Sequence, residues 1–395
     1  MRQPCRNDGR HGAAFILMGS LLLFGFPVQS TAASRRSSRS PWRFSLRLTG
    51  DSRYDDNILS LSSREKQLLK DPVTGRSDRF RIVSEDDVIF VPQVTAALGR
   101  HPRKGRNTDL TLTLRAYDYQ RNNVRDYQQY NLSIRQELNR SEQHGTVLSA
   151  GWSRVPHYYL RQLVDDEQSL LQGMTVRSSA DYAMNSAYVR ITQKVIDHVL
   201  TVSSSFARER RNYNAPFDGR DAGSNVTVLA ASIYPLARVS FRIRPYYEHE
   251  QRGSRGDLSG TNVVDDDIGF DGDLAGIDVR LRWGPDRDHR RTLRAWYKDE
   301  NRDFTTSTVT DAGHFGRSDD IQQFGAEYQR DLNETLSLRF RYRHRTNDVS
   351  LPGTAGMKTT SFKKNVFAAG LVFHFDRRLR SSSRGRRTAK RPPRS

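Results

Sequence analysis

Apolar and polar residues alternate with a period of two along much of this chain, most clearly between residues 336 and 345. One face of that stretch consists of Leu336, Leu338, Phe340 and Tyr342, and the other consists of Arg339, Arg341, Arg343 and Arg345. Side chains point to opposite sides along a β-strand, so the pattern predicts a strand with one apolar face and one charged face. In a soluble sheet the apolar face would cover a core. In a transmembrane barrel it would meet lipid, and the arginines would line the lumen.

Strand-like stretches of this kind recur from Trp42 to Phe375. We expect fourteen strands, at 42–49, 88–98, 108–119, 128–138, 146–154, 180–193, 196–209, 223–234, 237–248, 273–283, 290–301, 320–330, 334–346 and 364–375. Most of these stretches reach the roughly 9–11 residues that a tilted membrane strand needs. An even number of strands is also typical of bacterial barrels.

The connections between these stretches alternate in length. Those after the even-numbered strands are short, such as Lys194-Val195 and Pro235-Leu236, whereas those after the odd-numbered strands are mostly longer and rich in Gly, Asp, Asn and Ser. This alternation is typical of outer-membrane barrels. The sequence therefore predicts an all-β fold, a transmembrane antiparallel β-barrel with about fourteen strands. Its short turns and both of its ends would face the periplasm. A secreted soluble β-sandwich or solenoid is the alternative.

The two ends of the chain differ from the body. Arg2, Arg6 and Arg10 precede an apolar stretch from Ala13 to Phe26, which is the pattern of a cleaved signal peptide. An uncleaved anchor helix is the alternative. We divide the chain into a signal peptide (1–33), a basic segment (34–41), the barrel (42–375) and a basic, disordered periplasmic tail (376–395). The tail would meet peptidoglycan acids or anionic lipid head groups, or remain solvated. Export makes nucleic acid an unsuitable partner.

Composition supports the barrel and excludes several chemistries. The chain has 395 residues with 35% hydrophobic residues, 16 tyrosines and 18 phenylalanines, which suits a barrel with a wet interior and aromatic girdles. The one cysteine is Cys5, inside the predicted signal peptide. The mature chain would therefore have no disulfide and no cysteine-bound metal. No Gly-rich phosphate loop or dinucleotide fingerprint is present, and we expect no cofactor.

Two short motifs resemble a known family. The last predicted strand, with Phe367, Leu371, Phe373 and Phe375 on one face, resembles the terminal strand of bacterial outer-membrane proteins. The stretch Tyr54-Asp55-Asp56-Asn57-Ile58, just after the first predicted strand, resembles the opening of a broad family of outer-membrane β-barrel porins. Some members of that family belong to exopolysaccharide or surface-assembly systems. The resemblance implies an outer-membrane location, with membrane lipid, lipopolysaccharide and the barrel assembly machinery as partners. Family barrels usually end at the aromatic residue, whereas a basic tail follows here.

The formal net charge of the chain is +19, and arginine is concentrated on the predicted inward faces. The candidate lumen residues are Arg115, Arg135, Arg242, Arg244, Arg280, Arg282, Arg294, Arg339, Arg341, Arg343 and Arg345, and Arg43, Arg47 and Arg190 share their faces. A narrow channel focuses such a field and attracts anions. Alternatively, pairs between arginine and acid could plug the barrel. Beside the arginines of residues 339–345, Glu327 is the one inward acid that we identify, so charge should remain free there.

Other candidate chemistry is weaker. Asp265, Asp267, Asp271 and Asp273 fall in a predicted outer loop and could hold Ca²⁺ or Mg²⁺, although we favour a solvated acidic loop without a metal. A hydrolase at the outer rim would use His157, His249 or His314, but no spacing indicates a nucleophile. We therefore expect a non-enzymatic channel for polar, anionic solutes or saccharides. The alternatives are a plugged barrel that acts in surface assembly through its long loops, and a rim-active membrane hydrolase.

Overall fold

The computed structural model describes residues 42–71, 80–102, 106–139, 145–235, 240–254, 267–284, 289–306, 313–352 and 361–378. The predicted signal peptide, the basic segment 34–41 and residues 379–395 of the predicted tail lie outside this range. So do Asp265 and parts of several loops.

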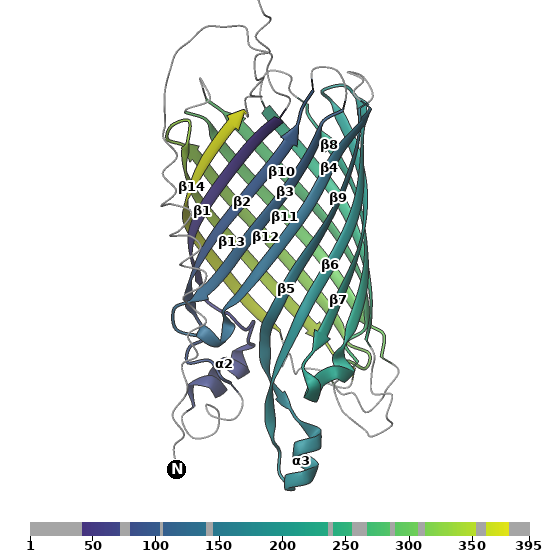
Figure 1. The fold of residues 1–395 in the computed structure, drawn as a ribbon. Coiled ribbons are helices and arrows are strands. Elements are labelled where there is room, and N and C mark those ends of the chain that lie inside the picture. Colours follow the sequence, from purple (N-terminus) through teal and green to yellow (C-terminus); the bar gives the residue numbers. More distant parts are fainter. Residues whose placement is uncertain are drawn as a thin grey trace, which may run out of the picture. The chain divides into compact units, whose positions relative to one another are not determined.

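Fourteen antiparallel strands close into one barrel, as the alternation predicts (Figure 1). They are β1 (Trp42–Asp55), β2 (Asp87–Arg100), β3 (Thr108–Tyr119), β4 (Tyr127–Asn139), β5 (Thr146–Val164), β6 (Arg177–Ile196), β7 (Leu200–Tyr213), β8 (Ala222–Ile233), β9 (Ser240–Ser254), β10 (Phe270–Trp283), β11 (Arg291–Phe304), β12 (Ser318–Asp331), β13 (Leu336–Ser350) and β14 (Phe362–Arg378). β1 pairs with β14 from Arg43↔Arg378 to Asp55↔Val366, which leaves no open sheet edge.

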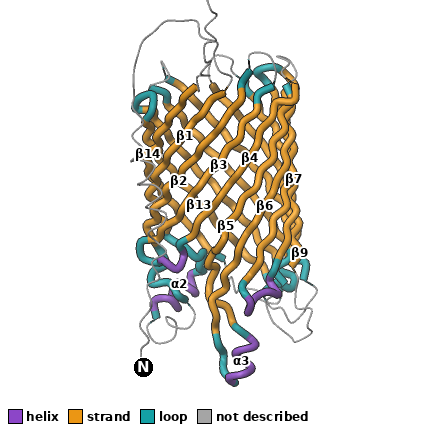
Figure 2. Tube along the Cα trace, in the orientation of Figure 1, coloured by secondary structure: helices purple, strands orange, loops and turns teal. Residues whose placement is uncertain are grey.

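The two ends of the barrel differ. Four short helices, α2 (Ser63–Lys70), η1 (Asn123–Arg125), α3 (Asp166–Gln172) and η2 (Ala215–Arg220), lie in connections after odd-numbered strands. Figure 2 shows the described helices at one end of the barrel, which we call the loop end. β1 begins and β14 ends at the opposite end, which we call the turn end. There the side chain of Asn333 accepts hydrogen bonds from the amides of Thr335 and Leu336 at 2.9 and 2.8 Å, forming a tight β12–β13 turn.

Several strands are longer than predicted. β1 continues to Asp55 rather than ending at residue 49, β5 continues to Val164 rather than 154, and β14 continues to Arg378. Gly50 and Asp51 are typical turn residues, so the sequence pattern predicts that the first strand ends before them. In the barrel, Asp51 points into a polar interior, where a carboxylate has cationic partners. The stretch Tyr54-Asp55 therefore belongs to β1, and the following loop begins at Asp56.

The outward face of the barrel is apolar and exposed. Phe367 and Leu371 on β14 are each 53% exposed, and Phe340 on β13 is 47% exposed. Their neighbours along each strand, such as Val366 and Val372, are buried inside the barrel. Among the described residues, none of the helices has the length and apolar content needed to cross a membrane.

Candidate functional site: the lumen and its capped mouth

The register places all eleven predicted lumen arginines on the inward face. On β13, Arg339, Arg341 and Arg343 lie opposite Gly370, Ala368 and Val366 of β14, while Phe340 points outward. Arg242 and Arg244 on β9 lie opposite Arg280 and Asp278 on β10. The other members of the predicted set occupy the same face of their strands by the same alternation: Arg115, Arg135, Arg282, Arg294 and Arg345.

Two of the arginines on β13 are paired with acids. Arg341 donates to Glu327 of β12 at 2.8 Å, so the predicted position of Glu327 beside these arginines is confirmed. Arg339 donates to both carboxylate oxygens of Asp51 at 2.6 and 2.7 Å. The expectation that Glu327 was the one available acid is therefore wrong. Asp51 lies beyond residue 49, where the sequence pattern ends the first predicted strand, so the pattern does not place it in the lumen.

Arg339 reaches Asp51 across the whole width of β14, and Gly370 allows this. Gly370 is the partner of both Asp51 on β1 and Arg339 on β13. A Cβ atom at this position would lie 2.7 Å from the carbonyl oxygen of Gly50 and would collide with the Asp51 carboxylate. The absence of a side chain at Gly370 thus leaves room for an ion pair between non-adjacent strands.

Asp278 is a second point where charge is neutralised. Its carboxylate pairs with Arg242 at 2.6 Å and also accepts a hydrogen bond from Arg294, and its side chain is 5% exposed. A buried carboxylate between two guanidinium groups is stabilised by both. Because two arginines face one carboxylate, the three side chains together have a net positive charge.

Other predicted lumen arginines have weaker or neutral partners. Arg135 lies 3.4 Å from Asp109. Arg115 donates to the amide oxygen of Gln93 at 2.6 and 2.9 Å. Arg115 therefore has a neutral hydrogen-bond partner and no carboxylate oxygen within 4.0 Å among the described residues.

A third group of inward arginines has no carboxylate oxygen within 4.0 Å among the described residues. It includes Arg244, Arg280, Arg282, Arg343 and Arg345 from the predicted set, together with Arg47 and Arg190. Arg244 and Arg345 lie beside aromatic rings instead, 5.9 Å from the centre of Tyr246 and 5.8 Å from that of Phe362. The lumen is therefore neither fully neutralised by ion pairs nor free of them.

The mouth at the loop end holds an apolar core that the sequence analysis did not identify. The described parts of the connection between β1 and β2 (residues 56–71 and 80–86), which we call loop 1, contribute Ile58, Leu59, Leu61, Leu69, Phe80 and Ile82 to a buried cluster. These side chains pack on Ile89 and Val91 of β2, Tyr119 of β3 and Tyr159 of β5. Val88 and Phe90 point outward, so Ile89 and Val91 belong to the inner wall. Loop 1 therefore covers part of the mouth instead of extending into solvent.

Asp56 and Asn57, in the stretch Tyr54–Ile58 quoted above, connect loop 1 to the barrel wall by hydrogen bonds. Asn57 is fully buried and donates to the carbonyl oxygens of Leu61 at 2.8 Å and Lys363 at 3.1 Å, and it accepts from the amide of Leu61 at 2.7 Å. Asp56 accepts from the amide and the side chain of Asn365 at 2.7 and 2.6 Å. Consecutive residues thus join loop 1 to β14.

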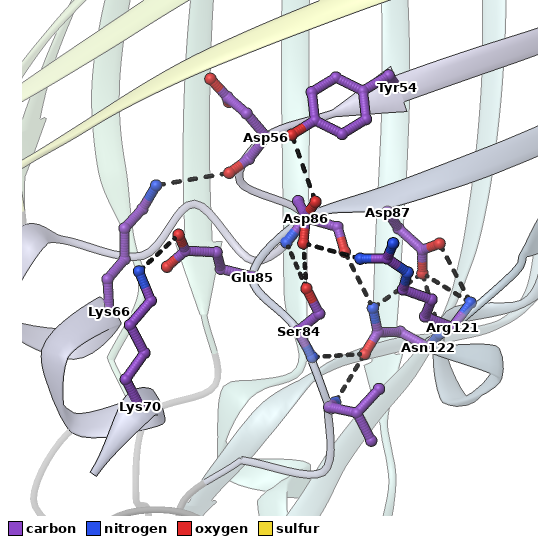
Figure 3. A network of polar contacts seen from close by, with 11 residues as sticks. Tyr54, Asp56, Lys66, Lys70, Ser84, Glu85, Asp86, Asp87, Arg121 and Asn122 are labelled. Atoms are coloured by element: carbon purple, nitrogen blue, oxygen red, sulfur yellow. Dashed lines mark hydrogen bonds and ion pairs between the residues drawn. The ribbon is translucent and has the colours of Figure 1, made fainter.

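A polar network holds the far side of loop 1 (Figure 3). Asp87 accepts from the backbone and side-chain nitrogens of Asn122 at 2.9 and 2.8 Å, while Asn122 accepts from the amide of Val83 at 2.8 Å. The hydroxyl of Ser84 donates to Asp86 and lowers the pKa of that carboxyl. On α2, a capping box joins Ser62 and Glu65. The described parts of loop 1 are therefore hydrogen-bonded to the barrel or its neighbouring loop at both ends.

The described residues of the acidic loop do not form a metal centre. Asp267 accepts from the amide of Gly269 at 3.0 Å. Asp273 lies on the outward face of β10, where it accepts from Tyr247 and is 2.9 Å from Nδ1 of His249. Asp271 shares that face, and Asp265 lies outside the described residues. No cluster of three metal-ligating side chains occurs in the described part of the chain.

Two of the three histidines considered for a rim hydrolase have acidic neighbours, and the third, His314, stacks on Phe304 with ring centres 5.1 Å apart. His157 is 3.6 Å from Asp181, and His249 contacts Asp273 as described above. Within the described ranges, no serine hydroxyl is hydrogen-bonded to either imidazole. Around His157 and His249, the described residues do not assemble a nucleophile and a base.

Comparison with solved structures finds membrane channels at low similarity. A mutant of the TodX monoaromatic hydrocarbon channel has a TM-score of 0.42 and 10% identity, covering 87% of this chain and 91% of that chain. The outer-membrane channel DcaP of Acinetobacter baumannii has a TM-score of 0.41 and 11% identity, covering 87% and 100%. An anion-selective porin from Comamonas acidovorans has a TM-score of 0.36 and 9% identity, covering 84% and 98%. No protein-family model and no curated protein matches the chain. The fold assignment rests on the strand pairing of the chain itself.

Proposed function

We propose that this chain is an outer-membrane channel whose positively charged lumen passes polar anions. A closed barrel with an exposed apolar outer face and charged residues inside fits the outer membrane. The turn end would face the periplasm, and the loop end, with loop 1 and α3, would face outside. Membrane lipid and lipopolysaccharide would surround the barrel.

The arginines without a carboxylate partner are the observation that carries this proposal. Arg343 and Arg345 follow the paired Arg341 on β13, and Arg244 lies on β9. A wall of low dielectric constant strengthens the field of such charges and raises the local concentration of anions. The channel would select by size and field, with no chemical step.

We expect the selectivity of the channel to depend on these arginines. In planar bilayers under a salt gradient, Arg244→Gln/Arg343→Gln/Arg345→Gln should shift the reversal potential toward cations. The shift should weaken as the Debye length falls from about 10 Å at 0.1 M salt to about 3 Å at 1 M. The matched control is Arg154→Gln/Arg208→Gln/Arg210→Gln, which removes the same charge from the outward face.

The control should conduct with wild-type selectivity. Equal shifts in the two triple variants would show that the overall charge of the protein, rather than the lumen, sets the selectivity. An unchanged reversal potential in the lumen variant would disprove the assigned role of these arginines.

A second candidate function is a closed barrel for surface assembly. It is favoured by loop 1, whose apolar core packs on the inner wall of the mouth. In that case the barrel would show no conductance, and its external loops would bind a partner such as a polysaccharide.

A further inference from the structure

The lumen contains a small pocket at the turn end, away from loop 1. It has a volume of about 280 Å³ and is lined by residues of six neighbouring strands, from β10 through β14 to β1. Pockets for small molecules usually measure roughly 300–1,000 Å³. This pocket therefore suits an inorganic ion or one end of a larger solute.

Guanidinium groups dominate the lining. Arg47 comes from β1, Arg280 and Arg282 come from β10, and Arg290 precedes β11. None has a carboxylate oxygen within 4.0 Å among the described residues. The Nε atoms of Arg47 and Arg282 are shielded from solvent and have no hydrogen-bond acceptor within the described part of the chain. Buried donors without acceptors cost free energy, so the pocket lacks an acceptor in its present form.

The acids of the pocket do not balance these charges. Asp331 already accepts hydrogen bonds from Ser337 at 2.7 Å and Gln329 at 3.1 Å. Glu334 lies in the β12–β13 turn and is exposed to solvent. The remaining charge favours an anion, and neutral donors such as Thr292 and His374 line the same space.

We infer that this pocket binds a compact oxyanion, namely phosphate or sulfate, free or as the terminal group of a solute that crosses the lumen. The planar fork of arginine matches the oxygens of such anions, and bonds between guanidinium and phosphate are among the stronger hydrogen bonds. A chloride ion would offer one acceptor centre instead of several oxygens. This inference rests on the proposed function, because it gives the anion-passing lumen a defined binding site.

Binding should be measured on the full-length barrel folded in detergent at low ionic strength, by calorimetry with inorganic phosphate and then with sulfate. Arg47→Gln/Arg282→Gln should weaken phosphate binding roughly tenfold or more, because two of the charged donors are lost. The matched control is Arg208→Gln/Arg210→Gln, which removes two arginine charges from the outward face of β7. It should bind phosphate within about twofold of the wild type, since a specific site depends on local donors rather than on the summed field.

Absence of phosphate binding by the wild-type barrel would overturn the inference. Equal weakening in both double variants would also overturn it, because the anion would then respond only to the summed charge. Displacement of inorganic phosphate by glucose 1-phosphate would identify a phosphorylated solute as the ligand, and failure to displace it would identify the free anion.

These outcomes are separable from failure of the channel proposal, because binding is measured without conduction. A barrel that binds phosphate but does not conduct would keep the site and lose the proposed function. A barrel that conducts anions but does not bind phosphate would keep the proposed function and disprove the site.

Discussion

At the scale of single residues, Asp51 and Gly370 change the interpretation of the arginine row on β13. Asp51 is 3% exposed and pairs with Arg339, although the two residues lie on strands separated by β14. The period-two pattern of Arg47, Thr49, Asp51 and Arg53 already continues past residue 49. Its signal was masked by Gly50, which is common in turns. The contact itself could not be predicted, because it depends on the register of β14 and on a residue with no side chain.

We expect Gly370→Ala to destabilise the barrel by roughly 1–3 kcal/mol, the usual cost of an added methyl group in a closely packed site. The new Cβ would meet the Gly50 carbonyl oxygen and displace Asp51 from Arg339. Urea unfolding of the detergent-folded barrel measures the change. The control is Gly253→Ala, where the added Cβ would have no atom within 4 Å. Equal stability of the two variants would mean that β1 shifts to absorb the methyl group.

At the scale of elements, the sequence predicted the strands well and the loops poorly. All fourteen predicted strands are present, and the main errors lie at strand ends. The capped mouth was missed, although Ile58, Leu59 and Leu61 are unusually apolar for an outer loop. That composition signals burial. It does not say that the burial site is the inner wall of β2, β3 and β5, which depends on barrel closure.

The assigned faces of the strands can be tested on β6 alone. Val189 is 54% exposed on the outward face, whereas Ser186 faces inward between Ser153 of β5 and Glu209 of β7. Val189→Arg should cost roughly 2–4 kcal/mol if the residue lies near the membrane midplane. Ser186→Arg should cost less, because its charge enters a wet lumen beside an acid. Folding into lipid vesicles measures both, and equal folding yields would show that the faces are wrongly assigned.

At the scale of the whole molecule, the arginine pocket and the apolar core of loop 1 lie at opposite ends of the barrel. The pocket with four arginines lies at the turn end, and the apolar cap lies at the loop end. The arginines on the predicted inward faces indicate a positive lumen, but the sequence does not separate an open pore from a plugged one. In the structure, the ion pairs leave several arginines without an acid, and loop 1 covers part of the mouth. We therefore expect a change in loop 1 to distinguish an open pore from a plugged one.

A substitution at Asn57 directly tests whether loop 1 obstructs the lumen. Asn57→Ala would leave the amide of Leu61 and the carbonyl oxygens of Leu61 and Lys363 without their partner, and each buried unsatisfied group costs about 1–3 kcal/mol. We expect loop 1 to detach, trypsin to cut at Arg64, Lys66 or Lys70, and single-channel conductance to rise. Asn225→Ala, on the exposed outward face of β8, is the control and should change neither measurement.

The pattern of outcomes separates the two candidate functions. A wild-type barrel that conducts, with a larger conductance in Asn57→Ala, would show an open channel that loop 1 narrows. A silent wild type and a conducting variant would show that loop 1 is the plug, which favours the surface-assembly function in the resting state. If trypsin removes loop 1 and the barrel still does not conduct, the channel proposal is wrong, because the obstruction must then lie among the arginines and acids of the lumen itself.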